Sequence, residues 1–167
     1  MDITIDITAD HTQNFLNGLS FLQTHQVLIG IPEGGEEESA EASGNEKETI
    51  SNVELAFIMT YGSPLKKIPA RPFIEPALAS SKAQKKIVRE MGNAAKQALE
   101  GNLGSARASL EKAGMAGQSA VQESMGGTPP PNSPSTAKRK EKKHGSAVTL
   151  IDEGNLKKAI TYVVEGD

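Results

Sequence analysis

Two long helical patterns follow one another between residues 77 and 121, and they constrain the fold more than any other part of the chain. Apolar residues recur at helical spacing from Ala77 to about Glu100. Gly101 is suited to end this helix and Asn102 to cap the next one. The second helix carries a stripe of mostly small residues, namely Leu103, Ala106, Leu110, Ala113, Gly117, Ala120 and Val121. Small side chains permit close approach, so we expect the stripe to pack on a helix, a sheet or a neighbouring subunit.

The core as a whole is expected to consist of small side chains. Nineteen of the 167 residues are Ala, and aromatic residues make up only 4%. Because burial energy follows the apolar area removed from water, at about 25 cal/mol per Å², the stabilisation per residue should be modest. A chain of this length is expected to form a single domain, here residues 1–167.

Strand patterns occur at residues 2–8, 26–31 and 160–164. In the first, Ile3, Ile5 and Ile7 alternate with polar residues, which is typical of a half-buried strand. A helix with Phe15, Leu16, Leu19 and Leu22 on one face is expected between the first two strands, and a short helix around Asn155–Lys158 before the last. Another short helix, with Val53, Ala56, Phe57 and Thr60 on one face, should stop at Gly62. This order predicts an α+β domain with a small, mainly antiparallel sheet packed by two to three helices.

Two long polar loops are predicted in addition to these elements. Residues 33–49 are rich in Glu, including Glu36, Glu37 and Glu38, and should form an extended, mobile loop. This loop is either a solvated segment of no specific role or a contact surface for a basic partner. Residues 126–147 are rich in Pro and Lys and are expected to be irregular. Residues 63–76 contain four prolines and should lack regular structure as well.

Composition excludes several classes of function. The net charge of −3 and the isoelectric point of about 5.7 argue against a general nucleic-acid binder. The absence of Cys excludes disulfides, thiol catalysis and Cys-ligated metal sites. No apolar run is long enough to span a bilayer, and the acidic N-terminus is unlike a signal peptide, so we expect a soluble protein with no membrane contact.

The sequence predicts no active site and no cofactor. His11, His25 and His144 are scattered, and none has the spacing of a metal-ligand set. No nucleophile elbow, P-loop or dinucleotide-binding motif occurs. Asp152 and Glu153 are adjacent in a turn, where a capping role is favoured over acid–base catalysis. We therefore expect a protein that is not an enzyme.

A run of cations is the strongest charged feature of the chain. It consists of Lys138, Arg139, Lys140, Lys142 and Lys143. Three interpretations are open: a solvated loop, a contact with another protein, or a contact with DNA phosphates that weakens steeply with salt. No aromatic residue lies close to the run in sequence to stack on bases.

Three segments together resemble the tailed-phage neck and tail-completion proteins, also called virion-morphogenesis proteins. The first is Val27–Pro32, followed by a variable loop, Val53–Ala56 and the pair Tyr61-Gly62. The second, and most specific, is Ile68–Phe73 continued by Glu75–Leu78. The third runs from Pro131–Thr136 through Lys138 and Lys140 to Leu150–Leu156 and the closing strand 160–164. The chain departs from the family pattern at Glu153, where Thr is usual, and at Met59 and Thr60, where an acidic residue is often found.

The resemblance implies structural work in a virion. Such proteins act at the junction between head and tail, as tail terminators or tail-completion proteins, and usually form rings around the DNA channel. The implied partners are further copies of the chain in a ring, expected to be a hexamer, the head-closure or connector ring, and the tail tube, with a passing contact to genomic DNA. The implied location is the virion neck, and the host cytoplasm during assembly. The alternative from a different class is a DNA-contacting accessory protein that uses residues 138–143.

The expected interface residues follow from charge. In a ring, one patch meets a different patch on the neighbour, so the acidic loop 33–49 and the basic run 138–143 are candidates to pair. Arg71 is expected to form a bidentate bond to a carboxylate of its own chain or of a neighbour. Structural roles are expected for Ile68, Pro69, Pro72 and Phe73 in the stiff segment 68–73. Asp152 and Gly154 should shape the turn before the short helix, with the Asp152 carboxylate accepting backbone N–H groups.

Overall fold

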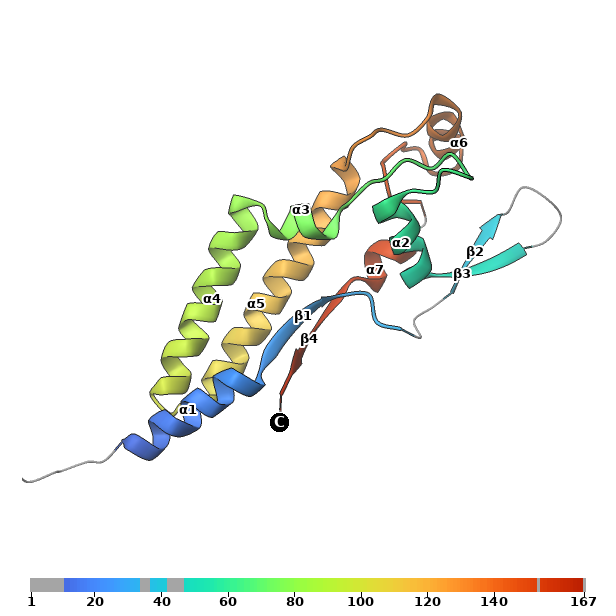
Figure 1. The fold of residues 1–167 in the computed structure, drawn as a ribbon. Coiled ribbons are helices and arrows are strands. Elements are labelled where there is room, and N and C mark those ends of the chain that lie inside the picture. The colour runs from blue at the N-terminus through green and yellow to red at the C-terminus, as the bar shows by residue number, and fades with distance from the viewer. Residues whose placement is uncertain (1–10, 34–36, 42–46, 153, 167) are drawn as a thin grey trace, which may run out of the picture.

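A computed structural model describes residues 11–33, 37–41, 47–152 and 154–166, with the backbone alone for 37–41 and 47–49 (Figure 1). The elements are α1 Thr12–Thr24, β1 Gln26–Gly30, β2 Glu37–Glu41, β3 Lys47–Ser51, α2 Asn52–Tyr61, α3 Ile74–Leu78, α4 Ser81–Leu99, α5 Leu103–Ser124, the 3-10 turn η1 Met125–Gly127, α6 Pro134–His144, α7 Asn155–Ala159 and β4 Thr161–Glu165. The predicted α+β class is confirmed. The predicted strand at 2–8 lies outside the described residues.

The antiparallel helices α4 and α5 form the longest part of the molecule (Figure 1). Gly101 lies between them with a φ of +85°, a conformation that favours glycine. The predicted helix from Ala77 to Glu100 is in fact divided into α3 and α4. The break comes at Ser80, whose hydroxyl accepts the backbone N–H of Ala83 and so caps α4.

The division also corrects the prediction that residues 63–76 lack regular structure, because α3 begins at Ile74 and contains Pro76. Proline is tolerated in the first turn of a helix, where its missing N–H has no partner to lose. At the start of α5, Asn102 occupies the predicted capping position, but its side chain makes no capping hydrogen bond.

The small-residue stripe of α5 is buried between a helix and a sheet of its own chain. Ala106, Ala113 and Val121 are fully buried. The sheet is formed by β1 and β4, which pair antiparallel with Leu28 opposite Val163. A Cβ on Gly117 would collide with Ile29 of β1, and one on Gly114 with the Tyr162 ring of β4. The sheet can therefore pack close to α5 because these two positions have no Cβ.

Two apolar clusters divide the core along the length of the molecule. One joins Phe73, Val121, Met125, Leu156 and Ile160 near α2, α3 and α7. The other joins Phe21, Ala94, Ala98, Ala106 and Leu110 between α1, α4 and α5. The predicted apolar face of α1 is only partly correct. Phe21 is buried and Leu22 packs against the cluster, whereas Phe15, Leu16 and Leu19 are exposed.

The predicted loop 33–49 contains strands instead. β2 and β3 form an antiparallel hairpin in which Glu38 lies opposite Ile50. The absence of apolar residues argued against regular structure there. Backbone N–H and C=O groups can nevertheless pair between strands without an apolar face. Glu36 lies outside the described residues.

The predicted irregular stretch 126–147 contains the helix α6, which also overturns the prediction of a second long loop. Ser133 accepts the backbone N–H of Thr136, Pro134 occupies the first turn, and Gly145 ends the helix with a φ of +67°. Prolines at 129–131 and 134 suggested a break. Pro134 instead starts the helix, because proline is well suited to the first helical position, and the Lys and Arg residues that follow are good helix formers.

The described helices include none that is both long and apolar enough to cross a membrane.

A glycine pair tests the close packing of α1 on α4. A Cβ on Gly18 would collide with the Ala98 carbonyl group, whereas a Cβ on Gly92, in the middle of α4, would meet nothing within 4 Å. We expect Gly18→Ala to destabilise the protein by about 1–3 kcal/mol, as overpacking does. Gly92→Ala should stabilise it by up to about 1 kcal/mol through helix propensity. Urea unfolding of both variants measures the difference, and equal midpoints would contradict the packing.

Candidate interaction site

Arg71 links two distant parts of the chain at the end of the molecule that carries α6. Its Nε donates to the Pro130 carbonyl at 2.7 Å, and its Nη2 donates to the Pro131 carbonyl at 3.1 Å. The backbone N–H of Arg71 donates to the Met59 carbonyl at 2.7 Å. With 7% of the residue exposed, Arg71 holds the segment before α6 against the segment after α2. Within its own chain, the Arg71 guanidinium therefore binds backbone carbonyl oxygens and not the predicted carboxylate, while a bond to a carboxylate of a neighbouring chain stays a prediction.

Lys140 links α6 to the segment that follows this helix. Its Nζ donates to the Ile151 carbonyl at 2.7 Å and to the Val148 carbonyl at 3.2 Å. The residue is only 9% exposed. Burial lowers the pKa of Lys140, and the negative charge of Asp152 partly opposes this shift. Lys140 is thus a buried structural cation, which corrects its place in the predicted basic surface.

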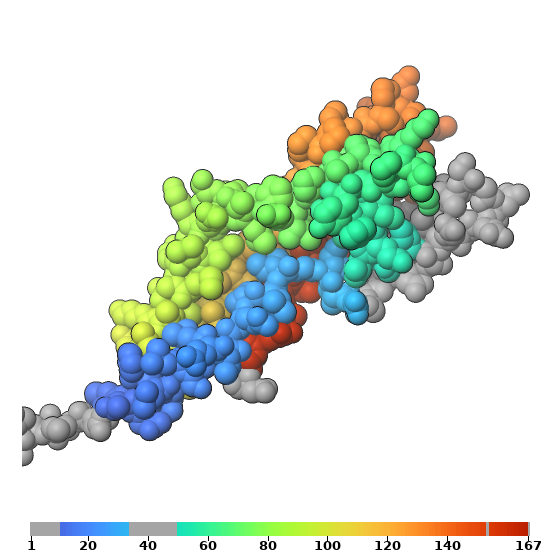
Figure 2. Space-filling view, in the orientation of Figure 1, coloured from blue at the N-terminus to red at the C-terminus, as the bar shows by residue number. Residues whose placement is uncertain are grey.

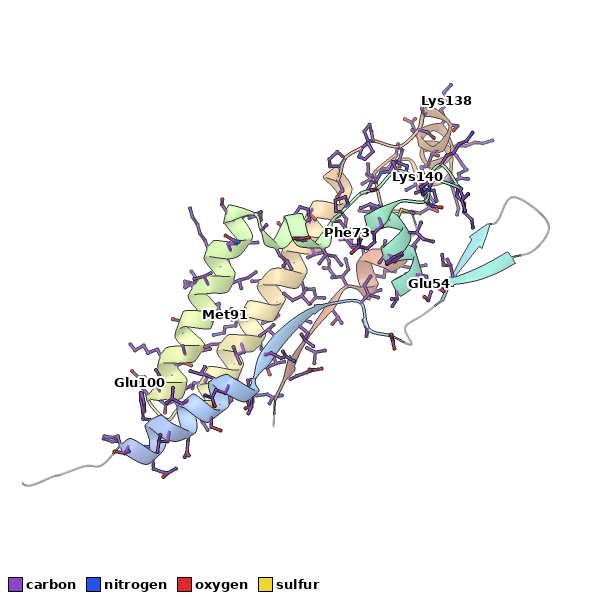
Figure 3. All side chains as sticks on the ribbon, in the orientation of Figure 1. Glu54, Phe73, Met91, Glu100, Lys138 and Lys140 are labelled. Carbon is purple, nitrogen blue, oxygen red and sulfur yellow. The ribbon has the colours of Figure 1, made fainter. Side chains whose placement is uncertain are left out.

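The remaining cations of α6 divide into two groups. Lys138, Arg139 and Lys142 are exposed, and Figure 3 shows Lys138 at the outer side of α6 and Lys140 on the inner side. Lys143 lies 4.0 Å from Oδ2 of Asp152, and Nε2 of His144 lies 3.0 Å from Oδ1 of the same residue. Lys143 is exposed as well, so the run presents four cations at the surface, of which Lys138, Arg139 and Lys142 are not next to Asp152.

Asp152 and Gly154 occupy the turn before α7. Asp152 was predicted to accept backbone N–H groups, but its carboxylate is paired with side chains of α6. From the sequence, His144 was expected only to extend the basic run. The local pattern around His144 does not indicate that Asp152 folds back against it. Gly154 has a φ of +84° at the N-cap of α7, which explains glycine at this position.

The segment 68–73 is anchored at both of its predicted ends. Ile68 and Ser63 form an isolated β-bridge with backbone hydrogen bonds of 2.8 and 2.9 Å. Phe73 is 1% exposed in the first apolar cluster. Pro69 and Pro72 are exposed between these anchors. Phe73 thus holds the segment to the core by its side chain, whereas Ile68 is held through its backbone.

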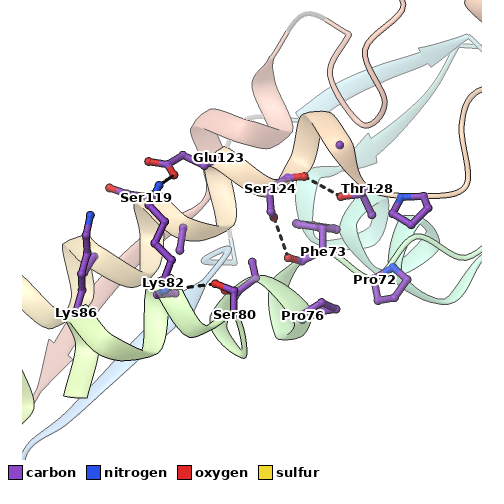
Figure 4. A pocket seen from close by; sticks show the side chains of 16 residues that line it. Pro72, Phe73, Pro76, Ser80, Lys82, Lys86, Ser119, Glu123, Ser124 and Thr128 are labelled. Carbon is purple, nitrogen blue, oxygen red and sulfur yellow. Dashed lines mark hydrogen bonds and ion pairs between the residues drawn. The ribbon is translucent and has the colours of Figure 1, made fainter. Parts of the chain in front are cut away.

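A groove of about 380 Å³ lies between α3, α4 and α5 and is lined by Phe73, Pro76 and Thr128 among others (Figure 4). Lys82 and Glu123 form an ion pair of 3.0 Å beside it. The hydroxyl of Ser124 donates to backbone carbonyls, as does that of Thr128. In the described part of the chain, no cluster of three or more His, Asp or Glu residues is arranged to hold a metal ion.

An exposed apolar surface on α2 was missed by the sequence reasoning. Phe57 was expected on the buried face with Ala56, but Phe57 is 64% exposed and Ala56 is buried. The ring centroids of Phe57 and Tyr61 lie 4.8 Å apart. Leu65, in the loop that follows α2, is almost completely exposed. The helix is apolar on most of its surface, so periodicity alone does not distinguish its inner face.

No family model, curated protein or solved structure matches this chain.

Two lysines two residues apart test the structural role of Lys140. Lys140→Ala should lower the free energy of unfolding by about 1–3 kcal/mol, because it leaves the Val148 and Ile151 carbonyls without their buried donor. The exposed control Lys138→Ala should change it by no more than about 0.5 kcal/mol. Chemical denaturation of the two variants measures both values. A Lys140→Ala variant as stable as the control would show that these carbonyls do not depend on the ammonium group.

Proposed function

We propose that this chain is a structural component of a tailed-phage virion at the head–tail junction, either a tail terminator or a tail-completion protein. The proposal rests on the resemblance of three sequence segments to that family. One observation supports it: the three segments, far apart in the chain, meet in one region of the fold. Arg71 of the second segment donates to the carbonyl of Pro131, where the third begins. Phe73 and Ile160 share a buried cluster, and Ile29 and Ile31 of the first segment pack against it.

Three motif residues have structural roles in this common region. Phe73 provides the apolar anchor, Arg71 holds the backbone before α6, and Lys140 holds the backbone before α7. Direct contacts between residues of the three segments are expected if the segments belong to one structural unit. The side-chain contacts of Arg71 and Lys140 in this region are with backbone carbonyls, an arrangement that suits a contact surface more than a catalytic centre.

The charged surfaces support assembly into a ring. The exposed cations of α6 and the Glu-rich β2–β3 hairpin lie at the same end of the molecule (Figure 1). If copies stand side by side in a ring, all of these ends lie in one plane. The hairpin of one copy would then lie next to α6 of the neighbouring copy. A head-to-tail contact of this kind is the type that closes a ring. Opposite charges there would fix register and speed encounter more than they raise affinity.

Charge reversal on α6 tests this contact. The variant Lys138→Glu/Arg139→Glu/Lys142→Glu leaves the buried Lys140 in place and changes only outward-facing charges. We expect it to lose the assembled ring, because cations that met acidic residues would now repel them. Light scattering at low salt, with negative-stain images, measures assembled mass, and the unchanged protein should loosen as salt rises.

The matched control places the same charge change on other helices. Lys85→Glu/Lys86→Glu/Lys112→Glu alters exposed lysines of α4 and α5 and should leave the assembled mass unchanged. Where the free protein is monomeric, the same comparison is made by co-sedimentation with assembled tails. An α6 variant that assembles, or binds tails, as well as the control would rule out the α6 contact.

A DNA-contacting accessory protein is the second candidate, favoured by four exposed cations on one short helix. DNA affinity measured over a range of salt concentrations distinguishes the two functions. A slope of several units in log affinity against log salt would favour DNA binding. Negligible binding at about 0.15 M salt would remove this alternative.

A further inference from the structure

Three large apolar side chains are exposed on α2 and in the loop that follows it, and we call them the α2 patch. Phe57 and Tyr61 are 64% and 69% exposed, and their rings are in contact. Leu65 in the loop is 98% exposed. The buried residues of the helix, Asn52 and Ala56, lie on a different side of it. Figure 2 shows α2 and this loop at the surface of the molecule.

The loop that carries Leu65 is held in place by backbone hydrogen bonds. Ser63 and Ile68 exchange N–H···O=C bonds of 2.8 and 2.9 Å. The N–H of Lys67 donates to the Pro64 carbonyl at 3.1 Å. Lys67 has a φ of +54°, which is uncommon for a residue with a side chain. A loop fixed in this way loses little conformational freedom on binding, so Leu65 is pre-organised for a contact.

The area of the α2 patch suits a reversible contact with another protein. With about 150–250 Å² for a whole aromatic side chain, the three side chains present roughly 400 Å² to solvent. An apolar patch of this size on a monomer is often functional. It is about half of the ~800 Å² that each partner contributes to a standard interface. Aromatic residues such as Phe57 and Tyr61 are also enriched in the centre of such interfaces.

Opposite charges flank the α2 patch. Glu54 is exposed at the N-terminal end of α2 (Figure 3). It lies on the same side of the helix as Tyr61, because seven residues make about two helical turns. Lys67 is exposed at the other end of the patch, in the loop. A patch with one acidic and one basic end is complementary to itself when a second copy lies antiparallel along it.

We propose that the α2 patch is a contact between two copies of this chain, related by a two-fold axis near Tyr61. Phe57 of each copy packs against Leu65 of the other, and Glu54 of each lies beside Lys67 of the other. The occupant is a second copy because the two ends of the patch carry the two halves of this charge pair. A contact of this symmetry closes at two copies. It is therefore separate from the head-to-tail contact of α6, and it does not rest on the proposed virion role.

Sedimentation equilibrium of the full chain tests the contact. All proteins carry the α6 charge reversal described above, so that assembly through α6 does not contribute. We expect a reversible dimer. Its dissociation constant should rise at least about tenfold in Phe57→Ala/Tyr61→Ala, as for aromatic side chains at the centre of an interface. The matched control Phe15→Ala/Leu16→Ala removes about half-exposed apolar side chains from α1 and should leave the dissociation constant unchanged.

A pair of charge substitutions tests the antiparallel arrangement. Glu54→Gln keeps the capping box of α2, which accepts Glu or Gln, but removes the attraction to Lys67. It should weaken the dimer of the otherwise unchanged chain several-fold. In the Lys67→Glu variant two carboxylates repel each other across the contact, so Glu54→Gln should strengthen that dimer instead. This reversal of sign is expected only if the two positions meet between copies.

Cross-linking provides a readout that does not depend on removing apolar side chains. The chain has no Cys, so Tyr61→Cys introduces a single thiol close to the two-fold axis. A short bis-maleimide should link two such chains several-fold faster than it links chains with Val88→Cys, a 66% exposed position on α4. A protein that stays monomeric, a dimer that survives Phe57→Ala/Tyr61→Ala, or equal cross-linking at the two positions would overturn the proposal. These results leave the α6 contact untouched, since the α2 substitutions do not alter its cations.

Discussion

The close approach of α4, β1 and β4 to α5 is the constraint on which the rest of the structure depends. Ala106, Ala113 and Val121 are fully buried in this helix, and its glycines admit Ile29 and Tyr162 of the sheet. Few aromatic side chains are available to fill a wider gap, so the backbones themselves must come close. Gly18 serves the same purpose where α1 crosses α4. The positions of β1 and β4 follow from their contact with α5, and the position of α1 follows from its contact with α4.

The α6 end is held by a different kind of interaction. Arg71, Lys140 and Asn132 each donate from the side chain to backbone carbonyls of segments that have no strand or helix of their own. Each such bond contributes about 1 kcal/mol net, or somewhat more when the donor is charged. Their greater effect is specificity, because a carbonyl buried without its donor is costly. These hydrogen bonds fix the shape of this part of the molecule although it contains few apolar residues.

The sequence predicted most of the helices and the strands of the main sheet, because their apolar spacing is regular. It did not predict α6, since Pro134 can either end or start a helix and only the Ser133 cap decides which. Nor did it reveal the hairpin, whose pairing is between backbone groups. At the candidate site, Phe73 was predicted as an anchor, but Lys140 could not be distinguished from Lys138, because both are lysines of one charged run. Which lysine turns inward depends on the carbonyls of residues 148 and 151, and those positions are set by the whole chain.

Locating the protein in an assembled particle tests the central claim most directly. The measurement is antibody labelling of purified virions produced from a genome that encodes this chain, viewed by electron microscopy and paired with quantitative mass spectrometry of the same particles. The account predicts label at the junction of head and tail, with several copies per particle in proportion to one ring. Absence of the chain from purified particles, or label confined to the head surface or the distal tail, would contradict it.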